Sequence, residues 1–159
     1  MSTWRSKALE LFPEFRERIL ATDDRLDLWR GIERDFYVAL RREDDRLVSR
    51  CIRYAVWTLR PTPQARTLAD VSASAARLLH RHADELHRWI ERYDFMQAQK
   101  GLRLHLGDEV YGEFETRFLE KTRRYPRHKR SKTVQRTGAS RSARRIKRAS
   151  PAAGLVRPI

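Results

Sequence analysis

Charge divides this 159-residue chain into two parts more sharply than any other feature of its sequence. All 21 Asp and Glu residues lie within residues 1–122, together with 22 Lys and Arg, so this part carries a formal net charge of only +1. Residues 123–159 contain 13 Lys and Arg and no acid. We therefore predict two parts: a folded domain over residues 1–122 and a tail over residues 123–159.

The tail is predicted to be a disordered segment rich in Arg and Lys. Of the 15 aromatic residues in the chain, only Tyr125 lies in it, and prolines and glycines interrupt its few large aliphatic residues. With little apolar surface to bury and strong repulsion between like charges, burial cannot offset the conformational entropy lost on ordering.

The first 122 residues are predicted to be all α-helical. Apolar residues recur every three to four positions, and no apolar alternation of strand length is present. The clearest stripe runs from Leu28 to Leu40 through Trp29, Ile32, Phe36 and Ala39. This pattern predicts a compact bundle of six or seven short helices, at residues 3–11, 13–21, 24–42, 44–59, 67–81, 91–100 and 107 to about 122.

Turn and capping residues set the expected boundaries of these helices. The acids at 23–24 and 44–45 precede apolar stripes, where a carboxylate can cap a helix N-terminus. Pro61 and Pro63 predict a loop after residue 60, and Gly101 and Gly107 predict that residues 102–106 form a connector. We also expect a break or kink near His82–Leu86.

Three side chains within one short segment form the only candidate metal site. On an unbroken helix, His80, Asp84 and His87 would lie at positions i, i+4 and i+7 on one face. Imidazole and carboxylate groups that converge in this way can bind a divalent metal ion. The alternative is that these residues line the core edge or the surface, and a helix break would destroy the alignment.

No other pattern indicates an enzyme or a cofactor. Cys51 lies on an apolar stripe, which predicts a buried and unreactive thiol. The glycines form no phosphate-binding loop. The four tryptophans, at positions 4, 29, 57 and 89, occur at helical spacing and are expected in the core. We therefore assign no catalytic residue, metal or cofactor from the sequence.

Several short segments together resemble a family of small bacterial all-helical proteins classed as a domain of unknown function. The segments are LELFPEF at 9–15, LWRGIE at 28–33, IRYAVW at 52–57, HRW at 87–89 and HLGDEVY at 105–111. The resemblance covers about residues 4–120 and implies a helical fold. It implies no catalytic residue, and it does not extend to the tail.

The tail contains two cationic blocks that can bind a polyanion such as nucleic acid. Lys and Arg bind phosphates by releasing condensed counterions, without reading sequence, and the prevalence of Arg favours paired contacts to phosphate. The residues predicted to do so are Arg123, Arg124, Arg127, Lys129, Arg130, Lys132, Arg141, Arg144, Arg145, Lys147 and Arg148. The alternative is a solvated extension with no function.

Targeting features are absent from the sequence. No apolar run approaches the roughly 18 residues that span a bilayer, and the first residues lack the apolar stretch of a secretory signal. We predict a soluble, cytoplasmic protein without a membrane partner. The favoured function is a non-enzymatic helical interaction domain with a protein partner and a polyanion-binding tail. The alternative is a small metal-assisted enzyme that uses the His80–His87 region.

Overall fold

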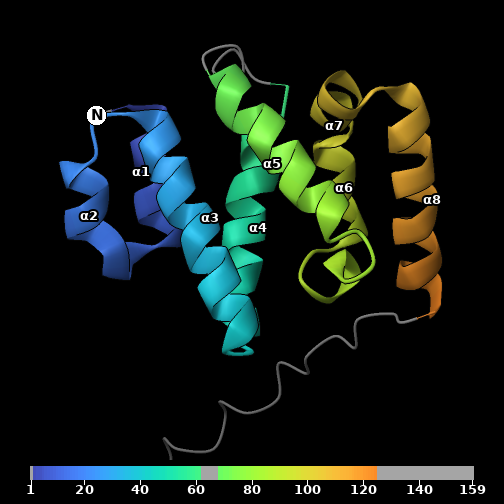
Figure 1. The fold of residues 1–159 in the computed structure, drawn as a ribbon, viewed down its shortest axis with the longest axis horizontal. Coiled ribbons are helices and arrows are strands. Elements are labelled where there is room, and N and C mark those ends of the chain that lie inside the picture. The colour runs from blue at the N-terminus through green and yellow to red at the C-terminus, as the bar shows by residue number, and fades with distance from the viewer. Residues whose placement is uncertain (1, 62–67, 125–159) are drawn as a thin grey trace, which may run out of the picture. The chain divides into compact units, whose positions relative to one another are not determined.

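The computed structural model describes residues 2–61 and 68–124, and in these residues it contains helices and no strand. Eight α-helices and two 3₁₀ turns lie wholly within this described part of the chain (Figure 1). Their bounds are α1 Thr3–Leu11, η1 Pro13–Phe15, α2 Arg16–Ala21, α3 Arg25–Arg41, α4 Asp45–Thr58, α5 Ala69–Arg81, η3 Leu86–Arg88, α6 Arg92–Gln97, α7 Gln99–Leu106 and α8 Asp108–Arg124. The predicted all-α fold is confirmed.

Helix α4 is the central element, and four of the other helices pack against it. Figure 1 shows α1 and α2 beside α3. Helix α5 crosses α4, and α6, α7 and α8 lie beyond α5. Helix α4 contacts α1, α3, α5 and α6, whereas α8 packs mainly on α7 and η3. The predicted disorder of the tail lies outside the described residues, apart from its first two residues.

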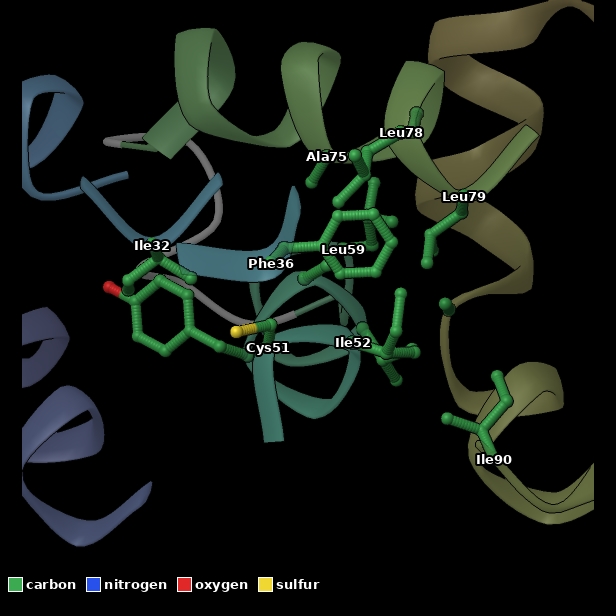
Figure 2. Close-up of a cluster of buried hydrophobic side chains, with 14 of the residues drawn as sticks. Ile32, Phe36, Cys51, Ile52, Leu59, Ala75, Leu78, Leu79 and Ile90 are labelled. Atoms are coloured by element: carbon green, nitrogen blue, oxygen red, sulfur yellow. The ribbon is translucent and has the colours of Figure 1, made fainter. Parts of the chain in front are cut away.

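The core joins the apolar stripes of α3, α4 and α5. Figure 2 shows Ile32 and Phe36 from α3 facing side chains of α4 and α5. The labelled core residues are Ile32, Phe36, Cys51, Ile52, Leu59, Ala75, Leu78, Leu79 and Ile90, and all of them are buried. These positions match the apolar periodicity of the sequence, because a helix with such a stripe is stable only when the stripe is covered.

A second, aromatic part of the core holds the C-terminal helices together. Phe95 of α6 stacks on Phe118 of α8 with ring centroids 4.2 Å apart, and it meets Phe114 edge to face at 5.2 Å. Tyr111 is buried in the same cluster, whereas Val110 is exposed. Tyr111, and not its neighbour Val110, therefore belongs to the buried stripe of α8.

Asp24 and Asp44 cap the N-termini of α3 and α4, as expected. The Asp24 carboxylate accepts hydrogen bonds from the backbone N–H groups of Leu26 at 3.0 Å and Asp27 at 3.1 Å. The Asp44 carboxylate accepts one from the N–H of Leu47 at 3.0 Å. Each bond satisfies a donor that the first turn of a helix leaves unpaired.

The connector predicted for residues 102–106 is wrong, because these residues belong to helix α7. Gly101 lies inside this helix, where a Cβ atom would be 2.3 Å from the carbonyl oxygen of Leu59. The glycine is therefore required for close packing against the end of α4 and does not mark a loop. Gly107, with φ of +82°, ends α7, and the predicted helix at 91–100 is divided between α6 and α7.

Candidate functional site

Two of the predicted polyanion-binding residues lie in the described structure, and both belong to a helix. Helix α8 continues two residues past the expected boundary at 122, so that Arg123 and Arg124 form part of its last turn. Both side chains are exposed. Their charges are favourable there, because the carbonyl end of a helix carries partial negative charge. The other predicted residues, Arg127, Lys129, Arg130, Lys132, Arg141, Arg144, Arg145, Lys147 and Arg148, lie outside the described residues.

The last turns of α8 contain more basic than acidic side chains. Arg117, two turns earlier, is bound to Asp84, with 2.6 Å between Arg117 Nη2 and Asp84 Oδ2. The hydrogen bond from Arg117 lowers the pKa of Asp84, and the charge of Lys121 acts in the same direction. Glu120 is the one acid in the last turn and a half, where it accompanies Lys121, Arg123 and Arg124.

The candidate metal ligands do not share a helix face. Helix α5 ends at Arg81, which confirms the expected break, and the chain reaches η3 through a turn. The His80 ring meets Phe114 edge to face at 5.8 Å, while Asp84 is paired with Arg117. Among the described residues, no group of three or more His, Cys, Asp or Glu side chains is placed to hold a metal ion.

His82, at the end of α5, lies in a cluster of aromatic rings. Its ring centroid is 5.0 Å from that of Phe36, 5.9 Å from Tyr37 and 6.4 Å from Trp89. Burial lowers the pKa of His82, an effect that Glu85 opposes and Arg81 reinforces. At neutral pH the imidazole is therefore uncharged, and it packs against these rings at the point where α5 ends.

Trp89 attaches the segment after this break to α4. Its indole Nε1 donates to the Asp45 carboxylate at 3.1 Å, and its backbone carbonyl accepts from Ser49 Oγ at 2.8 Å. Two polar contacts and a buried indole thus fix residues 86–90 against α4.

Cys51 is a buried core residue, as the sequence predicts. It lies among the apolar side chains of Figure 2, where burial raises the pKa of its thiol to about 12. At neutral pH the group is a thiol and not the nucleophilic thiolate.

The distribution of arginines over the surface of the folded part was not predicted from the sequence. The net charge of residues 1–122 is close to zero and gives no sign of it. In the structure, the exposed residues of α3 include Arg30, Arg34 and Arg41, and those of α5 include Arg77 and Arg81. The signal was available in the spacing, because these positions recur at helical periods opposite the buried stripes.

Among the described helices, none has the length and apolar character needed to cross a bilayer.

Comparisons with known proteins leave the family of this chain open. Searches with family models, against curated proteins and against solved structures give no match. The resemblance to a small bacterial helical family therefore stays a prediction.

Proposed function

We propose that this protein is a non-enzymatic helical interaction domain whose basic C-terminal tail, residues 123–159, binds nucleic acid without sequence specificity. The observation that carries the proposal is the segregation of charge, with 13 Lys and Arg and no acid in the last 37 residues. The exposed side chains of Arg123 and Arg124 begin this basic stretch on a folded helix.

The physical basis is the release of counterions. Each cation that neutralises a phosphate frees a condensed counterion, so binding is strong at low salt and weakens steeply as salt rises. Ten of the 13 cations are Arg, whose planar guanidinium can donate two parallel hydrogen bonds to one phosphate. Tyr125 is the one aromatic side chain of the tail able to stack on a base, so single strands should have little advantage over duplexes.

The helical part would supply the contact to a protein partner. The packing found for His80, His82 and Cys51 supports a structural role for the residue types most often used in catalysis. The tail would then concentrate the helical domain, together with the partner that it holds, on nucleic acid.

The test compares three full-length proteins of matched design. The tail variant carries Gln in place of Arg144, Arg145, Lys147 and Arg148. The body control carries Gln in place of four exposed arginines of the folded part, Arg16, Arg46, Arg53 and Arg92, which make no ion pair with the described residues. Both variants have four positive charges fewer than the wild type, so they separate the effect of the tail from that of net charge.

Binding to labelled duplexes of two unrelated sequences is measured by fluorescence anisotropy. We expect the wild type and the body control to bind both duplexes alike. We expect the tail variant to bind more weakly, with a salt slope reduced by about 0.9 for each phosphate that is no longer neutralised. Equal affinities for the tail variant and the body control would show that the tail has no specific part in binding.

A further inference from the structure

The outward faces of α3 and α5 together form a surface of arginines. Both helices pack on α4 through their buried stripes, so their exposed stripes point away from it. An ion pair joins Arg25 and Asp70 at the start of the two helices, with 3.9 Å between Nη2 and Oδ2. Near their ends, Arg81 Nη1 donates to the Tyr37 hydroxyl at 2.6 Å. The two helices therefore lie next to each other at both of these points, and α3 also contacts α5 directly.

Positive charge dominates the second half of each helix. We define the arginine face as Arg34, Arg41, Arg77 and Arg81, all of which are exposed. None of the four makes an ion pair with an acid of the described residues. Arg30, at the start of this stripe, is instead paired with an acid of its own helix.

Three of the four acids of α3 and α5 are paired with arginines. Asp27 binds Arg30 at 2.9 Å, and Asp70 binds Arg25. The Asp35 side chain is only 16% exposed and is paired with Arg18 of α2. Glu33, which is half-buried, is the remaining acid of α3 and α5. Glu85, just beyond the end of α5, is paired with Arg88. The near-zero net charge of the folded part thus conceals a local excess of positive charge.

We propose that the arginine face binds the phosphate backbone of a nucleic-acid duplex, as a second contact in addition to that of the tail. Arg34 and Arg41 are seven residues apart on one helix, a rise of about 10 Å, which matches the axial length of about three phosphates of one strand. Arg77 and Arg81 extend the surface across to α5. Ala73 and Ser74, one turn earlier on α5, are small enough to let a backbone approach.

The surface fits nucleic acid better than an anionic membrane. An interfacial membrane helix combines basic residues with large apolar side chains that enter the lipid. The large apolar residues that are exposed among the described residues are Leu20, Tyr93, Met96, Leu104 and Val110, and none of them lies on α3 or α5. A face with cations and no apolar anchor is the form that phosphate-backbone contacts take.

The proposal rests on the proposed function only for the class of ligand, and the same assay tests both separately. The face variant of the full chain carries Gln at positions 34, 41, 77 and 81. A triple variant retains Arg81 and its bond to Tyr37, in case that bond supports the fold. The tail variant and the body control are those defined above. Circular dichroism melts establish that each variant is folded.

We expect the face variant to bind a labelled duplex more weakly than the body control. Its salt slope should be reduced by about 0.9 for each phosphate that is no longer neutralised, or up to about 3.6 in all. The triple variant should show about three quarters of this reduction in slope. Salt slopes of the face and triple variants equal to that of the body control would overturn the proposal.

The remaining outcomes separate the two proposals. If the tail variant loses binding and the face variant matches the body control, the tail proposal stands and the face proposal fails. If the face variant loses binding and the tail variant does not, the reverse holds. If the four arginines are needed for binding to phosphatidylserine vesicles while neither the wild type nor any variant binds a duplex, both nucleic-acid proposals fail.

Discussion

At position 101 the backbone of α7 approaches the end of α4 so closely that no side chain fits. A Cβ atom there would lie 2.3 Å from the carbonyl oxygen of Leu59 and 3.0 Å from its Cα. Backbone atoms cannot move aside as a flexible side chain can, so the two helices would have to separate. A single residue, Gly101, therefore sets how closely α7 approaches α4.

The first prediction follows from this close approach. Gly101→Ala should lower the free energy of unfolding by about 1–3 kcal/mol, the usual cost of forcing an extra group into a packed site. Urea denaturation measures the change. The matched control is Gly112→Ala in α8, where an added Cβ meets nothing within 4 Å. This control should stabilise the protein by up to about 1 kcal/mol, because alanine favours the helix.

Opposite signs for these two substitutions are the decisive result. If Gly101→Ala were neutral or stabilising, the close packing of α7 on α4 would be contradicted. The sequence could not reveal this packing, because Leu59 is far from Gly101 along the chain. From the local sequence alone, two glycines at positions 101 and 107 predict a loop between them.

At the scale of single helices, caps were the feature easiest to predict. Asp24 and Asp44 each precede an apolar stripe, and both carboxylates accept backbone hydrogen bonds at the positions expected. The short helices were harder. Helices α6 and α7 are separated at Ala98, and such a break depends on tertiary packing more than on local pattern.

The cap of α4 supplies the second prediction. Asp44→Ala should cost about 1 kcal/mol of stability, because the Leu47 N–H loses its acceptor. Asp44→Asn keeps an oxygen in the same place and should recover most of this loss. Thermal or urea unfolding of both variants measures the difference. Equal destabilisation by the two substitutions would show that the charge of Asp44, and not its capping bond, stabilises the helix.

The third prediction concerns the pH response of two half-buried histidines, His82 at the end of α5 and His105 in α7. Burial lowers the pKa of His82, and burial with the charge of Arg77 lowers that of His105. In the unfolded chain each imidazole takes up a proton near its ordinary value of 6.5, whereas in the folded protein it stays neutral to lower pH. Stability should therefore be full above pH 6.5 and fall as pH drops below it.

Melting temperatures at about pH 7 and about pH 5 measure this effect, since most carboxylates remain ionised in that range. His82→Gln should reduce the loss of stability between the two values, and a double variant with His105→Gln should reduce it further. A pH dependence identical in the wild type and the double variant would contradict the burial of these two rings.

At the scale of the whole molecule, the fold class and most of the core could be predicted, because both follow from apolar periodicity. The stripes of α3, α4 and α5 are buried as expected, and the break after α5 is confirmed. The candidate site was less predictable. The alignment of His80, Asp84 and His87 depended on one helix continuing, and that helix ends at Arg81. The arginine face depends on which helices are neighbours, which local periodicity does not contain.

The central claim is that this protein holds nucleic acid through its positive charges. The most direct test is a salt series of the full-length wild-type protein binding a labelled duplex. If six to ten phosphates are neutralised, affinity should fall by about 10³–10⁵ between 50 and 200 mM salt, with a linear dependence of log K on log salt. Binding that is absent at low salt, or whose affinity does not change with salt, would contradict the claim.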